Sequence, residues 1–145
     1  MGGTMKRLVF ESWLLLFYFD CVMHFLRFEE LHRIVEEAPI RPTTFANVIP
    51  SDSLCRAMDY ACVFYLHRVL CLQRSSATTL LLRRYGWSAE LVIGAQTIPF
   101  KSHAWCEING KVVNDKPYMQ DIYTVLERCE VERSGHEHYF RRHDR

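Results

Sequence analysis

Residues 102–115 read SHAWCEINGKVVND, and this stretch decides the fold because it predicts a β-hairpin. Residues 102–108 and 111–114 are typical strand segments, and they flank Asn109-Gly110, a residue pair favoured in the tight turn between antiparallel strands. A hairpin brings side chains from its two strands face to face. The length of the loop therefore determines which side chains become neighbours.

The loop has two possible lengths with opposite consequences. A two-residue loop pairs Ile108 with Lys111 and sends His103 and Asp115 to opposite faces of the ribbon. A three-residue loop that contains a G1 bulge pairs Glu107 with Lys111, and His103 then faces Asp115 directly.

The side-chain pattern favours the three-residue loop. In that register the opposite charges of Glu107 and Lys111 are paired. The apolar side chains gather on one face, which carries Ala104, Cys106, Ile108 and Val112. The other face carries His103, Trp105, Glu107, Lys111, Val113 and Asp115. We therefore predict a bulged hairpin in which His103 and Asp115 are neighbours.

Residues 71–86 predict a helix that comes before the sheet. Gly86 is placed as its C-cap, and basic residues occupy its last turn. The small residues 75–77 allow this helix to approach a sheet closely. Residues 90–94 then predict a buried strand that leads into the hairpin.

Two further helices are predicted nearer the N-terminus. Residues 6–37 predict one long helix, apolar almost all round in its first half, and two nearby prolines end it. Ser51 or Asp52 is the expected N-cap of the next helix, which contains Cys55 and Cys62. Helices followed by antiparallel strands predict an α+β fold, with the helices packed on one face of a small sheet.

The composition fits one domain. The chain has 145 residues, of which 49% are hydrophobic and 24% charged, which is enough for a core. Within it we expect a helical docking segment over 1–49, a catalytic core over 50–126 and a polar tail over 127–145. The net charge of +1 gives no sign of the clearly basic surface that binds nucleic acid.

The N-terminal region does not predict export. Lys6 and Arg7 precede an apolar stretch, but Glu11 interrupts it, and Asp20 closes the uncharged run 12–19 before it is long enough to span a membrane. The six cysteines form no CxxC pair and no zinc-type spacing. We therefore expect a reduced, cytoplasmic protein without a metal site.

Three residues have the chemistry of a thiol-based active site. Cys71 lies near the start of the helix over 71–86, where the helix dipole and free backbone N–H groups favour a thiolate. His103 is the natural base, and Asp115 would orient its ring and stabilise the imidazolium. Asn114 is an alternative partner for His103, but the predicted register points it to the other face.

These residues lie in blocks that resemble a known family. The blocks 71–75, 89–94, 99–107 and 110–115 are similar, in this order, to the transglutaminase-like B protein of lasso-peptide gene clusters. The resemblance implies a papain- or transglutaminase-like fold with Cys71, His103 and Asp115 as the catalytic triad. It also implies the reaction, in which a leader peptide is removed from a ribosomally made precursor before a partner cyclase closes the ring.

The resemblance also implies partners. The chain is too short for a fused leader-binding domain of PqqD type, so it resembles the split form, which works with a separate small leader-binding protein. The apolar first helix is the expected docking surface, with Trp13, Phe17 and Phe25. The expected oxyanion donors are the Cys71 backbone N–H and, by chemistry alone, Gln73.

No metal or cofactor is needed for this reaction. His136-Glu137-His138 has no third ligand nearby and is expected to be solvated in the polar tail. Two other functions remain open from the sequence: amide transfer to an amine by the same triad, and a non-catalytic scaffold that presents the precursor to the cyclase.

Overall fold

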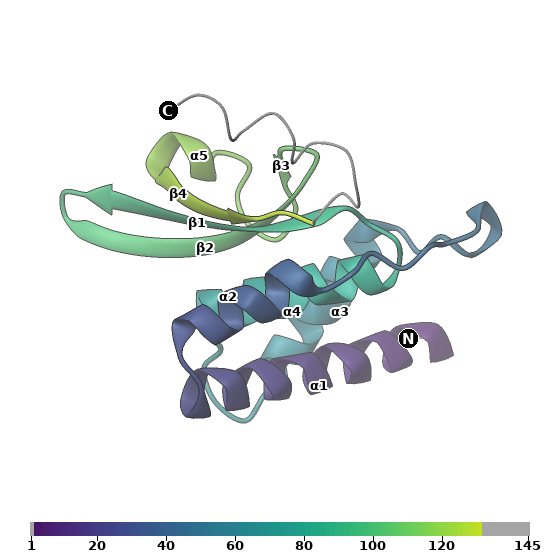
Figure 1. The fold of residues 1–145 in the computed structure, drawn as a ribbon. Helices are drawn as coiled ribbons and strands as arrows, with labels where there is room; N and C mark the ends of the chain where they lie inside the picture. Colours follow the sequence, from purple (N-terminus) through teal and green to yellow (C-terminus); the bar gives the residue numbers. More distant parts are fainter. Residues whose placement is uncertain (1, 132–145) are drawn as a thin grey trace.

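A layer of helices packs against one face of an antiparallel sheet in the computed structural model, which describes residues 2–131 (Figure 1). Within these residues the helices are α1 (Gly3–Phe25), α2 (Phe28–Glu37), α3 (Ser51–Val63), α4 (Cys71–Arg84) and the short α5 (Met119–Ile122), with a 3₁₀ turn, η1 (Phe45–Asn47). The strands are β1 (Ala89–Thr97), β2 (Phe100–Ile108), β3 (Lys111–Val112) and β4 (Thr124–Cys129), in the order β3-β2-β1-β4. The predicted α+β class is confirmed.

The first helix is two helices, not the single one predicted over 6–37. The backbone becomes extended at Leu26 and Arg27, and the chain turns back so that α2 lies beside α4 and β4 (Figure 1). A straight helix of that length would extend for about 48 Å, further than a domain of this size. The break allows Leu31 and Val35 to be buried in the core.

α1 is long and apolar enough to cross a membrane by length and composition alone, which the sequence prediction had excluded. In this fold its inner face packs on α3 and α4, and Leu16 and Phe19 are fully buried. Only 33% of its most apolar window is buried, so the packing accounts for part of its apolar character.

α4 lies between the other helices and the sheet, as its small residues predict. Ser75, Ser76 and Ala77 are all buried, and the Ser75 hydroxyl donates to the Ala104 carbonyl of β2 at 2.9 Å. Gly86 follows the helix with φ +91°, which confirms its predicted place at the C-terminus. The helix before it, α3, begins at Ser51, with Pro50 rather than Ser51 or Asp52 as its N-cap.

The predicted three-residue hairpin loop is wrong. Ile108 pairs with Lys111, and Asn109 and Gly110 form a two-residue loop with φ values of 50° and 77°. Two successive positive φ angles are what a type I′ turn requires, and Asn-Gly is the pair best suited to it. The conformational preference of Asn-Gly for this turn therefore outweighs the grouping of apolar side chains on one face, from which the longer loop was predicted.

The correct register changes what the hairpin side chains contact. Val113 joins the main core, while Val112 packs on the other face of the sheet with the smaller cluster of Val92, Trp105 and Met119. Glu107 does not face Lys111. It is fully buried, and its carboxylate accepts hydrogen bonds from Trp105, Gln120 and Arg128 at 2.7, 2.6 and 2.7 Å.

The sheet continues into the segment that was predicted as a polar tail from residue 127. β4 runs to Cys129, which is fully buried. The buried Arg83 guanidinium holds this end in place by donating to the carbonyls of Cys129 and Ala89 at 2.8 Å each, and to those of Val35 and Ala38. His136-Glu137-His138 lies outside the described residues.

Candidate active site

His103 and Asp115 form a hydrogen-bonded pair. His103 Nε2 lies 2.7 Å from Asp115 Oδ2, and each side chain is 24% exposed. In an uninterrupted two-residue hairpin these residues would lie on opposite faces. They meet because β3 ends at Val112 and the chain then bends.

The bend begins where the β2–β3 ladder stops. Val113 N–H donates to the Cys106 carbonyl at 2.9 Å, but Cys106 N–H donates to the Asn114 side-chain oxygen at 2.7 Å. Asn114 therefore points inward, toward α4, and Asp115 is directed toward His103. The predicted pairing of His103 with Asp115 is present, although it arises by a different route.

The environment of Asp115 keeps its carboxyl group ionised. Partial burial alone would raise the pKa of Asp115, but the hydrogen bonds from His103 and from the Lys116 backbone N–H outweigh it and hold the pKa below its ordinary value. A carboxylate that is ionised at neutral pH can fix the imidazole ring and stabilise its protonated form.

Aromatic rings pack around His103. Its ring centroid lies 5.3 Å from that of Tyr123 and 6.2 Å from that of Trp105. Gly94 of β1 pairs with His103 of β2. A Cβ atom on Gly94 would approach Trp105 and Tyr123 to within 2.7 and 2.9 Å. The missing side chain makes room for these rings. An isolated glycine inside a strand was the available sequence signal for this close approach.

Cys71 is the first residue of α4 and the exposed member of the six cysteines, all of which are free thiols within residues 2–131. Burial raises the pKa of Cys55 to about 11 and the pKa values of Cys106 and Cys129 to about 12. These three thiols are therefore poor nucleophiles at neutral pH. Accessibility alone thus favours Cys71 as the reactive thiol.

The contacts between α4 and β2 follow a regular progression. Thr79 contacts the Cys106 sulfur at 3.3 Å, and Ser75, one turn earlier, contacts the Ala104 carbonyl. One helical turn and two strand residues cover similar distances, about 6 and 7 Å. Continued by one more step along both elements, this progression points to Ser102 as the residue level with Cys71. The His103 side chain, one residue further, packs with Trp105 and Tyr123 rather than with the Ala104 and Cys106 face that contacts α4.

The edge of β2 next to His103 is open. β3 pairs only with Glu107 and Ile108, so no described strand covers this edge of β2 at His103. The hydrogen bonds within residues 2–131 join His103 to Asp115 and include none from Cys71. The structure thus joins two of the three predicted residues directly and carries the third on the adjacent helix.

A loop fastened to α1 leads into Cys71. Asp20 of α1 accepts hydrogen bonds from Tyr65 and His67, each at 2.8 Å. Interactions with the Arg68 backbone and with Asp20 raise the pKa of His67. This connection was not foreseen, because nothing in the sequence indicates that Asp20 would lie beside a loop more than forty residues later.

Gln73 does not have the role predicted for it. Its side chain is buried, its Nε2 donates to the Leu16 carbonyl at 2.9 Å, and its Oε1 accepts from Leu70 N–H at 3.4 Å. These bonds tie the start of α4 to α1. Gln73 is therefore a structural residue rather than an oxyanion donor.

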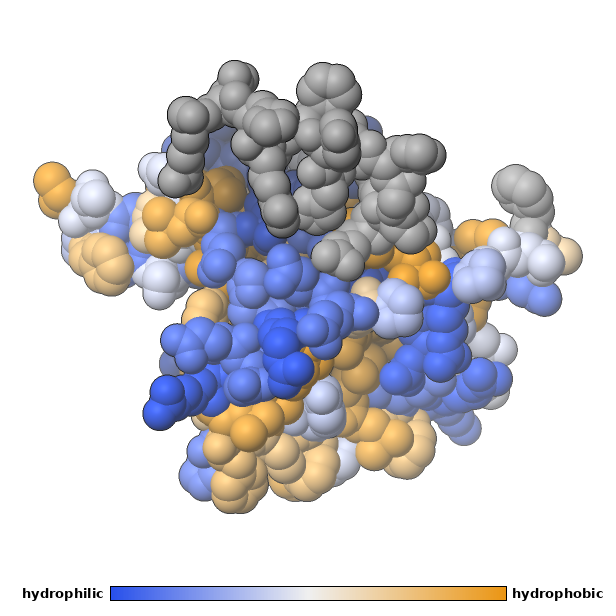
Figure 2. Space-filling model, viewed as in Figure 1, coloured by the Kyte–Doolittle hydropathy of each residue, from blue (hydrophilic) through white to orange (hydrophobic). Residues whose placement is uncertain are grey.

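An apolar surface covers the outer side of α1, where Figure 2 shows orange side chains along the lower edge of the molecule. Phe17 and Phe25 are exposed there, as predicted. Trp13 is half-buried, with its ring stacked on Phe17 at 5.8 Å and packed against Tyr65. Other exposed apolar residues on α1, at the end of α3 and on the segment before α4 are Phe10, Leu14, Tyr18, Val63, Phe64, Leu66 and Leu70.

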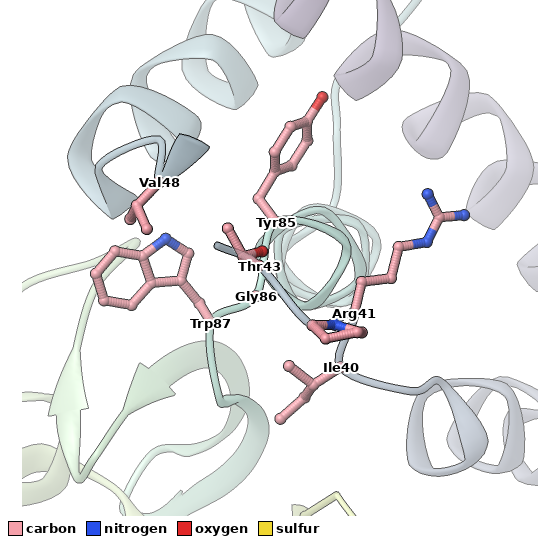
Figure 3. Close-up of a pocket in the computed structure, with 8 residues that line it drawn as sticks. Ile40, Arg41, Thr43, Val48, Tyr85, Gly86 and Trp87 are labelled. Carbon is pink, nitrogen blue, oxygen red and sulfur yellow. The ribbon is translucent and has the colours of Figure 1, made fainter. Parts of the chain in front are cut away.

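A cavity of about 310 Å³ lies at the opposite end of α4 from Cys71 (Figure 3). Tyr85, Gly86 and Trp87 form one wall, and the segment after α2 forms the other. Fourteen helical residues separate this cavity from Cys71 by about 20 Å. It is not part of the predicted active site.

Comparisons with known proteins identify the family of this chain. A family model described as the transglutaminase-like superfamily matches residues 15–128, well over half of the chain. The microcin J25-processing protein McjB of Escherichia coli is 45% identical over 56 residues, which are 39% of this chain and 27% of that protein. The match thus covers about a quarter of the relative's length. No solved structure matches the chain.

Proposed function

This chain belongs to the transglutaminase-like superfamily, and we propose that within it the protein is the cysteine peptidase that removes the leader from a lasso-peptide precursor. The similarity to a microcin-processing protein supports this substrate class. The observation that carries the proposal is the 2.7 Å bond between His103 and Asp115, at the level of β2 where the exposed Cys71 is expected to lie.

The reaction proceeds through a thioester. The Cys71 thiolate attacks the carbonyl carbon of the last leader residue, and the C–N bond breaks as protonated His103 gives its proton to the departing core amine. Water, deprotonated by His103, then attacks the thioester and releases the leader as a carboxylic acid with the thiol restored. Asp115 binds Nε2 of His103, so Nδ1 is the nitrogen that exchanges protons with the thiol and the substrate.

The start of α4 supplies the oxyanion donor. The first bond inside the helix runs from Arg74 N–H to the Leu70 carbonyl, which leaves the N–H groups of the first turn without helical partners. We assign the Cys71 N–H to the developing oxyanion, since it is nearest the attacking sulfur.

The partners follow from the same proposal. The precursor peptide binds at the Cys71 end of α4, and a small PqqD-like leader-binding protein docks on the outer face of α1, around Phe17 and Phe25. The cyclase receives the freed core. Six free thiols are consistent with a reducing, cytoplasmic location.

Amide transfer to an amine is the second candidate, because the superfamily is transglutaminase-like. It uses the same thioester and differs only in what attacks it. Mass spectrometry of the products separates the two functions, since hydrolysis gives free leader acid while transfer gives a cross-linked peptide.

The decisive experiment incubates purified protein with precursor peptide, with and without the leader-binding protein. Wild type releases the leader, and Cys71→Ala does not. Cys62→Ala, which changes a half-buried thiol on α3, is the matched control and retains activity. Full leader removal by Cys71→Ala would overturn the proposal and favour a non-catalytic scaffold.

A further inference from the structure

We propose that Asn114 is a positioning residue that holds the three parts of the active site in register. This inference rests on the proposed function, and it assigns to Asn114 a role other than that of third triad member. The side chain is buried, and its hydrogen bonds go to Cys106 and Ser75 rather than to His103.

Two hydrogen bonds define this role. Asn114 Oδ1 accepts from Cys106 N–H of β2 at 2.7 Å, and Asn114 Nδ2 donates to the Ser75 hydroxyl of α4 at 3.0 Å. Ser75 in turn donates to the Ala104 carbonyl at 2.9 Å. These three hydrogen bonds form a chain that starts at β2, passes through the Asn114 side chain to α4, and returns from Ser75 to β2.

Each member of this chain stands beside a triad residue. Asn114 directly precedes Asp115, Ala104 directly follows His103, and Ser75 lies one helical turn after Cys71 on the same face of α4. A shift of any one bond therefore moves a catalytic group relative to the other two.

The amide is suited to this place because it is both acceptor and donor. Where the ladder breaks, Cys106 N–H would be left buried without a partner, and the Asn114 oxygen replaces the missing backbone carbonyl. The amide nitrogen then reaches across to α4. A carboxylate of the same shape lacks this donor, and an apolar side chain lacks both groups.

The test compares Asn114→Ala and Ser75→Ala with wild type. Ser12→Ala is the control, because Ser12 is a buried serine whose hydroxyl also donates to a backbone carbonyl, that of Leu8, within α1. Three quantities are measured for each variant: the thermal unfolding midpoint, the rate of Cys71 alkylation by iodoacetamide between pH 5 and 9, and kcat and KM for leader removal.

Misplacement of catalytic groups by about 1 Å costs roughly 10²-fold in rate, so we expect Asn114→Ala to lower kcat by about that factor with little change in KM. The pH profile of Cys71 alkylation should change as well, because in the proposed mechanism His103 is the base for this thiol. Ser75→Ala should show a smaller change of the same kind, and Ser12→Ala should change only the unfolding midpoint.

Folded Asn114→Ala and Ser75→Ala proteins with wild-type kcat and alkylation profiles would overturn the inference. If Asn114→Ala does not fold, Ser75→Ala carries the test, because it keeps the Asn114 bond to Cys106. Alkylation needs no substrate. Suppose that the wild type cleaves no precursor, and that Asn114→Ala still differs from it in the Cys71 alkylation profile. This result would refute the peptidase function and support the positioning role.

Discussion

Asp115 bonds to His103 across a hairpin whose second strand ends three residues earlier, at Val112. The pair therefore depends on a bend and on the contacts that hold it, rather than on strand pairing.

Asp115→Ala should reduce kcat for leader removal by about 10² to 10⁴-fold, because the imidazole loses the group that orients it and stabilises its charge. Asp115→Asn keeps a hydrogen-bonding side chain and should retain more activity than Asp115→Ala. Asp121→Asn, an exposed change on α5, is the control. Equal activity of wild type and Asp115→Ala would remove Asp115 from the mechanism.

The stability contribution of Asp115 should depend on pH in one direction. Its pKa is lower in the folded protein than in the unfolded chain, so the stabilisation is fully present above the unfolded value, about 3.9, and is lost as pH falls through the folded value below it. Urea unfolding from pH 7 to pH 3 should show the wild type's advantage over Asp115→Asn shrinking at the acid end. A gap that widened on acidification would contradict this.

Gly94→Ala should destabilise the protein by about 1–3 kcal/mol, because the new Cβ would overlap the rings of Trp105 and Tyr123. Leader removal should slow as well, since these rings pack around His103. Urea unfolding and kcat measure the two effects. Gly3→Ala, with no atom within 4 Å of the new Cβ, is the control and should leave stability almost unchanged.

Arg83→Met should destabilise the protein by about 3–5 kcal/mol, because it leaves buried carbonyl groups from α2, β1 and β4 without their donor. Arg84→Met, at a partly exposed position in the same helical turn, should cost less than about 0.5 kcal/mol. Chemical unfolding of both variants is the measurement. Similar losses of unfolding free energy in the two variants would show that loss of a positive charge, and not loss of the buried hydrogen bonds, destabilises the protein.

Phe17→Glu and Phe25→Glu should weaken binding of the leader-binding protein while leaving Cys71 alkylation unchanged, because both side chains point outward from α1. A pull-down quantifies the binding. Ile98→Glu changes a more exposed apolar residue on the β1–β2 turn and should have no effect. Undiminished binding by both phenylalanine variants would place the docking surface elsewhere.

The sequence was sufficient for the fold class, for α3 and α4 and for the hairpin strands, because these depend on local pattern, but it did not indicate α5 or β4. It also singled out His103 and Asp115, which the structure pairs. Gly86 as a C-cap and the small face of α4 needed no tertiary information. The hairpin register was mispredicted, since the Asn109-Gly110 turn preference outweighed the opposed charges of Glu107 and Lys111.

The remaining errors come from tertiary contacts. The bend after Val112 depends on Asn114 reaching Ser75, thirty-nine residues away in sequence. Gln73 was predicted as an oxyanion donor by its chemistry alone, whereas its bond to the Leu16 carbonyl depends on how α4 packs on α1. The break between α1 and α2 carries neither proline nor glycine, so no local signal marked it.

The exposure of Cys71, among thiols that are otherwise at least partly buried, has a consequence for oxidative chemistry. Peroxide reaches the accessible thiol first and converts it to a sulfenic acid, which thiol reductants reverse, whereas further oxidation to the sulfinic acid is not reversed by them. Because the core cysteines are shielded, such damage would stop the proposed peptidase reaction without unfolding the protein. A thiol reductant would restore activity from the sulfenic acid but not from the sulfinic acid.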